Sequence, residues 1–92
     1  MYSIHYDRPA QVWLEKFSKK NPDLVAKIVK KIDWLAENAD QIDHEKMKGH
    51  PEMSLHFGGY RILYRLDRLQ QRLTICFVDK HDEAYQKLKR KK

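Results

Sequence analysis

The sequence predicts an α+β fold in which two helices pack on one face of a mostly antiparallel four-stranded sheet, with a further helix at the C-terminus. Two observations support this prediction. Apolar residues recur at helical spacing between residues 8 and 38, whereas between residues 53 and 79 they alternate with polar ones. The 92 residues fit one small domain. We therefore expect a single domain over residues 1–92, in the order β-α-α-β-β-β-α.

The first half of the chain predicts one short strand and two helices. Residues 2–6 alternate between apolar and polar side chains, which is typical of a strand. A helix over about residues 8–19 follows, because its apolar side chains recur every three or four positions. Asn21-Pro22 ends this helix, and a second apolar stripe predicts another helix from Pro22 to about residue 38. The connection is so short that the helices must form an antiparallel hairpin.

The second half predicts a loop, three strands and a helix. Residues 41–51 are polar and favour a loop. The strands are expected at residues 53–57, 60–66 and 73–79, where alternate side chains are apolar. Gly58-Gly59 provides the turn between the first two strands, since glycine tolerates a positive φ. Residues 82–92 have helical spacing and a basic end.

The composition favours a cytoplasmic protein with a polyanionic partner. Lys and Arg total 19 against 13 Asp and Glu, which gives a net charge of +6. Nucleic acid, an acidic protein and an anionic membrane all fit this charge. The lone Cys76 excludes an internal disulfide, and no apolar run approaches the ~18 residues of a membrane span. The basic C-terminal run fits either a nucleic-acid-binding tail or a helix end that complements the helix dipole.

The alternation in the strands also defines a second face of the sheet, turned away from the helices. The polar side chains expected on this face, or just beyond the last strand, are Ser54, His56, Arg61, Arg65, His81 and Tyr85. Histidine serves as acid or base near neutral pH, and arginine holds phosphate in a bidentate fork. Such a surface suits an RNA phosphate, and cleavage by the 2′-hydroxyl route needs no metal or other cofactor.

Three segments carry a resemblance to a known family. They are Lys46–Gly49, Phe57–Asp67 and Val78–Tyr85. They are similar to the segment that enters the central hairpin, the hairpin itself and the C-terminal signature of the RelE/ParE toxin superfamily. The resemblance implies a type II toxin of the RelE branch. Such a toxin is a ribosome-dependent endoribonuclease that cleaves A-site mRNA by 2′-OH attack, inhibits translation and is silenced by a cognate acidic antitoxin.

The resemblance also implies roles for individual residues. We assign His56 as the base, Arg61 as the cation that stabilises the pentacovalent phosphate, and His81 as the acid, while Tyr85 stacks on a base or orients the phosphate. Ser54 departs from the family pattern, which has a basic residue there. The expected RNA or ribosome contacts are Lys46, Lys48, Arg65, Lys87, Lys89 and Arg90.

Other interpretations of the same residues remain open. The ParE branch of the same fold inhibits DNA gyrase without catalysis, and an inactive basic RNA- or DNA-binding module also fits. Without the motif, His56 is an ordinary solvated residue, Arg61 a cross-strand ion-pair partner and Tyr85 a packing residue. The presence of His56, His81 and Tyr85 together favours the nuclease.

Overall fold

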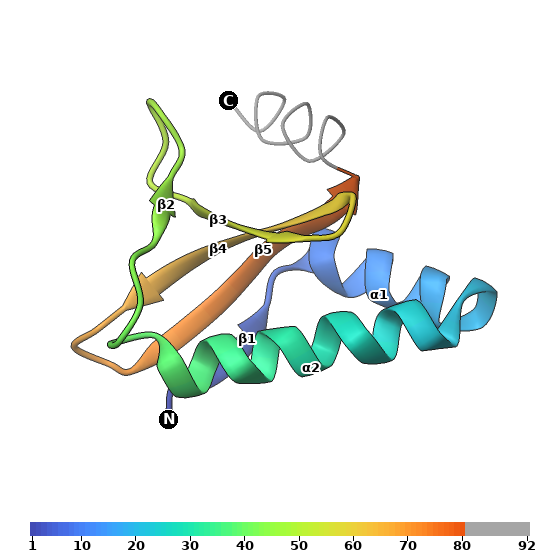
Figure 1. Cartoon of the computed structure of the whole chain (residues 1–92), viewed down its shortest axis with the longest axis horizontal. Coiled ribbons are helices and arrows are strands. Elements are labelled where there is room, and N and C mark those ends of the chain that lie inside the picture. Colours follow the sequence, from blue (N-terminus) through green and yellow to red (C-terminus); the bar gives the residue numbers. More distant parts are fainter. Residues whose placement is uncertain (81–92) are drawn as a thin grey trace.

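The computed structural model of the chain describes residues 1–80, in which two helices cover one face of a five-stranded sheet (Figure 1). The helices are α1 (Arg8–Lys20) and α2 (Pro22–Asn38). The strands are β1 (Ser3–Tyr6), β2 (Glu45–Lys46), β3 (Met53–Phe57), β4 (Tyr60–Asp67) and β5 (Arg72–Lys80). The predicted α+β class is confirmed. The helix expected over residues 82–92 lies outside the described residues.

The predicted helical hairpin is confirmed, and Asn21 forms its corner. The backbone N–H of Asn21 donates to the carbonyl of Phe17 at 2.7 Å and closes α1. The Asn21 side chain accepts a hydrogen bond of 3.2 Å from the N–H of Leu24 and caps α2. Pro22 opens α2 at a position where its missing N–H leaves no intrahelical bond unmade. With one residue between them, the helices can only run antiparallel.

The core lies between the helical hairpin and the sheet. Its most deeply buried side chains are Ile28, Ile32 and Leu35 of α2, Ile62 and Tyr64 of β4, and Leu73 and Ile75 of β5. The helical residues recur at three- and four-residue spacing, and the strand residues recur at every second position. These two periods bring one stripe of α2 onto one face of the sheet, as the sequence predicts. No helix within residues 1–80 is long and apolar enough to span a membrane.

The sheet has the order β1-β5-β4-β3-β2 and contains one strand more than the sequence predicts. β1 lies parallel to β5, while the other neighbours are antiparallel, so the sheet is mixed. The additional strand, β2, lies inside the segment expected to be a loop. It comprises two residues that pair with Met53 and Ser54. The expectation of four strands is therefore wrong, because two residues are too few to show an alternating pattern.

A bulge in β5 shifts the register next to the centre of the sheet. Leu63 pairs with Phe77 and Tyr64 pairs with Ile75, which leaves Cys76 as the extra residue. Cys76, Leu63 and Phe77 form a second small apolar cluster with Met47. The alternation places Leu63 and Phe77 on the face of the sheet opposite the helices, which we call the open face.

Candidate functional site

Strand register assembles a polar row across the open face. His56 of β3 pairs with Arg61 of β4, and Arg61 pairs with Asp79 of β5. Glu45 of β2 pairs with Ser54 of β3, two residues before His56. Paired residues in a sheet share a face, as do residues two apart in one strand. Five polar side chains from four strands therefore lie together at the end of the sheet where β3 turns into β4.

Glu45 lies between the two predicted site residues of β3 and β4. Its Oε1 accepts a hydrogen bond of 3.1 Å from Nη1 of Arg61, and its Oε2 lies 3.8 Å from Nε2 of His56. The side chains of His56 and Glu45 are 54% and 52% exposed, whereas that of Arg61 is 6% exposed. The site thus presents an accessible imidazole and carboxylate beside a guanidinium that is held in place.

The burial of Arg61 corrects the expectation that its side chain is displayed on the sheet surface. The predicted face is right, since Arg61 points away from the helices. The side chain is nevertheless covered, and its Nη1 also donates to the hydroxyl of Ser54 at 2.5 Å. A buried guanidinium needs such acceptors, because an unpaired charge away from water is costly. Glu45 and Ser54 supply two of them.

Sequence reasoning missed Glu45, and it placed Ser54 on this face without giving it a role. Ser54 is buried, and its small side chain lets Arg61 bond to its hydroxyl. The family pattern has a basic residue at this position, so the resemblance assigned no role to a serine there. Glu45 gives no signal, since its strand is too short to be recognised. The one available clue is that Glu45 directly precedes Lys46, the first residue of a segment that resembles the family.

A hydrogen bond between half-buried His44 and buried Tyr64 fixes the chain just before Glu45. His44 Nε2 lies 2.7 Å from the carbonyl of Ala39, and His44 Nδ1 lies 2.6 Å from the hydroxyl of Tyr64. A carbonyl only accepts, so Nε2 carries the proton and Nδ1 accepts from Tyr64. Burial, with a smaller contribution from the charge of Glu45, raises the pKa of Tyr64 to about 12. The hydroxyl therefore remains a donor over the physiological range, and β2 starts from a fixed point.

Arg65, an expected RNA contact, is engaged by structural partners on the open face. Its guanidinium donates to Oδ2 of Asp7 at 3.2 Å and to Sγ of Cys76 at 3.0 Å. It also lies 3.8 Å from the buried carboxylate of Glu52. Arg65 thereby links β4 to the residue that precedes α1. Its half-buried side chain still borders a wide basic hollow.

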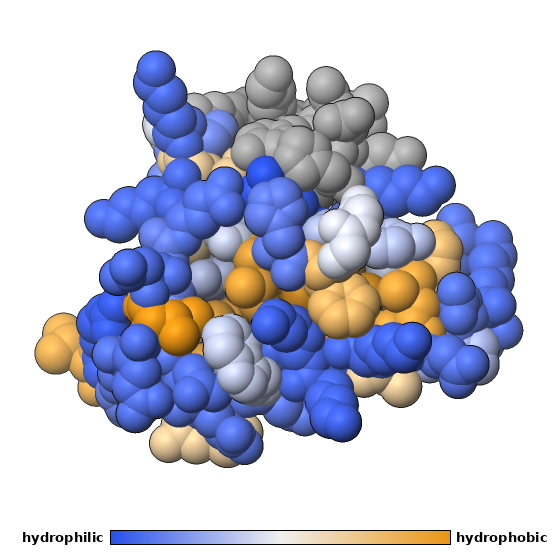
Figure 2. Space-filling model, in the orientation of Figure 1, coloured by the Kyte–Doolittle hydropathy of each residue, from blue (hydrophilic) through white to orange (hydrophobic). Residues whose placement is uncertain are grey.

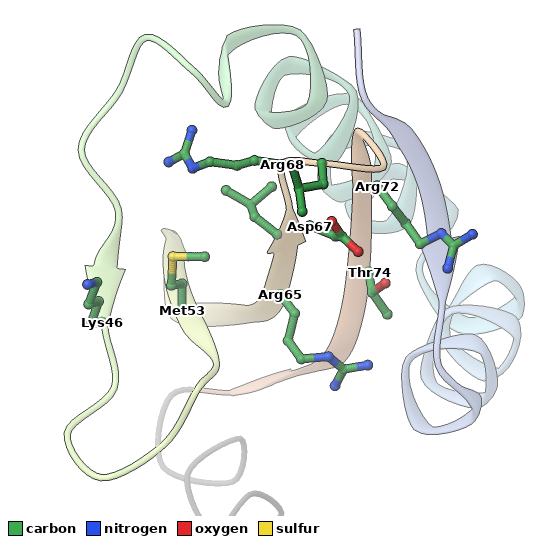
Figure 3. Close-up of a pocket in the computed structure, with 9 residues that line it drawn as sticks. Lys46, Met53, Arg65, Asp67, Arg68, Arg72 and Thr74 are labelled. Carbon is green, nitrogen blue, oxygen red and sulfur yellow. The ribbon is translucent and has the colours of Figure 1, made fainter.

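This basic hollow lies where β4 turns into β5 and has a volume of about 750 Å³ (Figure 3). Its cationic lining residues are Lys46, Arg65, Arg68 and Arg72. Figure 3 shows their charged ends spread over the width of the hollow rather than converging on one point. Such an arrangement suits an extended polyanion better than a single phosphate group. Sequence reasoning did not single out Arg68 and Arg72, which follow the Asp67 turn.

The remaining predicted residues are placed as follows. Lys48 is exposed in the turn between β2 and β3. The residues His81, Tyr85, Lys87, Lys89 and Arg90 lie outside the described residues. Within residues 1–80, no three His, Cys, Asp or Glu side chains group as metal ligands. The structure thus brings His56 and Arg61 together with Ser54 and with the unpredicted Glu45, whereas Lys46 and Arg65 line the basic hollow.

Comparison with known proteins identifies the class to which this small α+β domain belongs. A family model described as the ParE toxin of the type II toxin–antitoxin system, parDE, matches residues 4–85. The chain belongs to this family. The predicted membership of the RelE/ParE superfamily is therefore confirmed. A search of curated proteins found no match.

Solved toxin structures share the fold. The isolated RelE toxin of E. coli superposes with a TM-score of 0.70 at 20% identity, covering 96% of this chain and 99% of that one. The intact E. coli RelBE toxin–antitoxin complex gives 0.66 at 22% identity, with 87% and 96% covered. The YoeB–YefM complex from Staphylococcus aureus gives 0.71 at 20% identity, with 88% and 98% covered. These similarities extend over nearly the whole of each chain.

Proposed function

We propose that this toxin is an endoribonuclease that cleaves mRNA on the ribosome by 2′-OH attack and thereby inhibits translation. The observation that carries the proposal is the placement of His56 opposite Arg61 on neighbouring strands, with the Glu45 carboxylate between them. This group contains a proton acceptor open to solvent and a guanidinium fixed within reach. Those are two of the parts that transfer of a phosphoryl group to a neighbouring hydroxyl requires.

In this mechanism His56 removes the proton from the 2′-hydroxyl, and the oxygen attacks the adjacent phosphorus. The negative charge that develops on the pentacovalent phosphate is stabilised by Arg61, whose Nη1 exchanges the Glu45 oxygen for a phosphate oxygen. Glu45 then faces the newly formed imidazolium of His56 at 3.8 Å and stabilises it. His81 protonates the departing 5′-oxygen, and Tyr85 stacks on a base or orients the phosphate. The bond that forms is 2′-O to phosphorus, and the bond that breaks is phosphorus to 5′-O.

Glu45 is a second candidate for the base. Its carboxylate is as exposed as the imidazole of His56, and it already accepts a hydrogen bond from Arg61. The two assignments differ in the effect of matched substitutions. With His56 as the base, His56→Gln lowers the single-turnover rate much more than Glu45→Gln does, and with Glu45 as the base the order is reversed.

The proposed partners are the ribosome with its A-site mRNA and a cognate acidic antitoxin. The basic hollow, with Lys46 and Arg72 among its lining residues, supports the first by offering dispersed positive charge to a nucleic-acid backbone. The second is supported by the similar structures that are complexes of RelE with RelB and of YoeB with YefM. We propose the cytoplasm as the site of action, where ribosomes are found.

Inhibition of DNA gyrase is the second candidate function. The match of the family model to the ParE toxin over residues 4–85 favours it. A gyrase inhibitor needs no acid, base or transition-state cation. Under this alternative, the ion pair between Glu45 and Arg61 serves only to hold β2 against β3 and β4.

Ribosomes stalled on a defined mRNA, mixed with purified toxin, distinguish the candidates. Wild type should cut the A-site codon, and Arg61→Ala should cut it about 100-fold or more slowly, the usual loss when a preorganised charge on the transition state is removed. Arg8→Ala, which removes an equal charge from the exposed start of α1, should cut at the wild-type rate. Intact mRNA together with inhibited DNA supercoiling would refute the nuclease and support the gyrase inhibitor. Unchanged cleavage by both Arg61→Ala and His81→Ala would refute the assigned roles.

A further inference from the structure

An apolar hollow lies on the helical side of the molecule, away from the open face. Its volume is about 370 Å³, and it is lined by Lys27, Lys30, Lys31, Trp34 and Phe57. Lys27 lies three and four positions before Lys30 and Lys31, and Trp34 lies four and three positions after them, so the four residues form one stripe along α2. Figure 2 shows apolar surface on this side of the molecule between rows of hydrophilic side chains. We call this feature the Trp34 hollow.

The walls of the Trp34 hollow are formed by two aromatic side chains. Trp34 is 39% exposed, a large value for an indole that lies beside other apolar groups. Phe57 is half-buried against the main core at the end of β3, which holds the opposite wall in place. An exposed tryptophan beside a second aromatic is the kind of surface that protein partners use as an anchor point.

The rim of the Trp34 hollow is cationic. Lys27, Lys30 and Lys31 all line it, and no acidic side chain of the described residues does. The ammonium group of Lys31 lies 4.1 Å from the centre of the Trp34 ring, within range of a cation–π contact. The hollow thus combines an apolar floor with a positive border, and its complement is an apolar side chain flanked by carboxylates.

We propose that the Trp34 hollow is the docking site of an acidic segment of the antitoxin, which inserts an apolar side chain between Trp34 and Phe57 and places carboxylates against the three lysines. This inference rests on the proposed toxin function for its partner. RNA fits less well, because Lys31 covers the face of Trp34 on which a base would stack. A second copy of this chain would bring a net charge of +6 against the same lysines.

Occupation of the Trp34 hollow also gives the antitoxin a route to the candidate catalytic face. Phe57 follows His56 directly in β3, with its side chain on the other side of the sheet. β2 pairs with β3 only at Met53 and Ser54, so the outer edge of β3 is not covered by β2 from Leu55 onward. A segment anchored at Phe57 needs only to pass around this edge to cover the imidazole of His56. The anchor and the blocked site are thus adjacent but separate.

The two tryptophans provide a direct test by NMR. Trp13 of α1 is buried in the core, whereas Trp34 of α2 is exposed. Their indole N–H signals therefore report on two different places. The probe is a synthetic peptide of glutamates with spaced leucines. Its controls are the same peptide with glycine for leucine and with lysine for glutamate. The glutamate–leucine peptide should shift the Trp34 signal and leave that of Trp13 in place. No shift at Trp34, or an equal shift with the lysine peptide, overturns the proposal.

Substitutions then separate the floor of the hollow from its rim. Trp34→Ala should weaken the peptide about 30-fold, as expected for an aromatic anchor. Lys27→Gln with Lys30→Gln should weaken it about 3- to 10-fold and flatten the salt dependence. The matched control is Lys16→Gln with Lys20→Gln on α1, whose ammonium groups lie about 6 Å from the Phe17 ring, and it should bind as wild type does.

Growth of cells that co-express the antitoxin provides the second readout. Trp34→Ala lies outside the candidate catalytic group, so it should stay toxic and should escape silencing. If the antitoxin silences Trp34→Ala to the same extent as wild type, the proposed docking site is wrong, while the assignment as a toxin stands. If wild type neither cleaves mRNA nor arrests growth, the proposed function fails, and the peptide titration alone decides whether the hollow binds acidic segments.

Discussion

The hydroxyl of Tyr64 provides a quantitative test of how the chain before Glu45 is held. Tyr64 is 1% exposed, and its hydroxyl donates to Nδ1 of His44 at 2.6 Å. Tyr64→Phe removes this donor while keeping the ring in the core. At pH 8 the loss of one hydrogen bond should lower the free energy of unfolding by about 1 kcal/mol. The imidazole of His44 should also become less ordered, and Glu45 with it.

The alkaline range makes the prediction specific to Tyr64. Its pKa is about 12 in the folded chain against 10.0 for an unburied tyrosine. As the pH rises past 10, the unfolded chain loses this proton first, so wild-type stability falls through the interval up to pH 12. At pH 11 the loss is about 1.4 kcal/mol, one pH unit above the unfolded pKa. Phenylalanine has no proton to lose. The stability deficit of Tyr64→Phe at pH 8 should therefore vanish near pH 11.

Urea denaturation of both proteins at pH 8, 9, 10 and 11 measures this difference. Titration of lysines and of the other tyrosines affects both proteins alike and cancels in the comparison. A deficit that stays constant from pH 8 to pH 11 would show that the hydroxyl of Tyr64 is not buried and bonded as described. A second measurement, the rate of RNA cleavage at pH 8, should fall in Tyr64→Phe if the placement of Glu45 depends on this bond.

Three further substitutions test the hairpin turn, the core and the support of Arg61. Gly58 has a φ of 59°, and a Cβ added there would meet no neighbouring atom. Gly58→Ala should therefore lower the free energy of unfolding by about 1 kcal/mol through backbone strain alone, whereas Gly59→Ala, the control, should lower it less. Ile32→Ala should cost about 2–5 kcal/mol in urea denaturation, since Ile32 is fully buried, while Val12→Ala on the exposed side of α1 should cost under about 0.5 kcal/mol. Ser54→Ala removes an acceptor of Arg61 and should slow RNA cleavage about 10-fold, with the unchanged Km showing that substrate binding is intact.

The helical hairpin was predictable because its signals are local. Two long apolar stripes indicate both the two helices and the side of each helix that is buried. The Asn21-Pro22 break indicates the corner between them. The three long strands were predictable for the same reason, since alternation is visible over five or more residues. β2 was not predictable. Its two residues become a strand only because β3 offers an edge at Met53 and Ser54, and that edge exists only after the chain has folded.

The candidate site shows a different limit of the sequence. Alternation correctly predicts which face His56 and Arg61 occupy, but it carries no information on whether a side chain on that face is covered. The burial of Arg61 depends on Glu45, which arrives from the unpredicted strand, and on the small size of Ser54. Sequence pattern thus predicts the direction of a side chain, while its partners follow from tertiary pairing.

The basic hollow and the candidate catalytic group lie toward different ends of the open face. Arg61 pairs with Asp79 near one end of β5, and Arg72 begins β5 at the other, seven residues away and thus roughly 20 Å distant along the strand. The charge of Arg61 is already opposed by Glu45, so it contributes little long-range potential. The basic hollow, in contrast, carries four cationic side chains and one carboxylate among its lining residues.

This separation predicts that binding and catalysis respond to different substitutions. Arg72→Gln should raise Km and lower the salt dependence of binding by about one phosphate contact, with kcat unchanged. Arg61→Lys keeps the charge but loses the planar fork, so it should lower kcat and leave Km near the wild-type value. Steady-state cleavage at several salt concentrations separates the two effects. If both variants changed Km alone, Arg61 would contribute to binding only, and its assigned role as the cation that stabilises the transition state would be refuted.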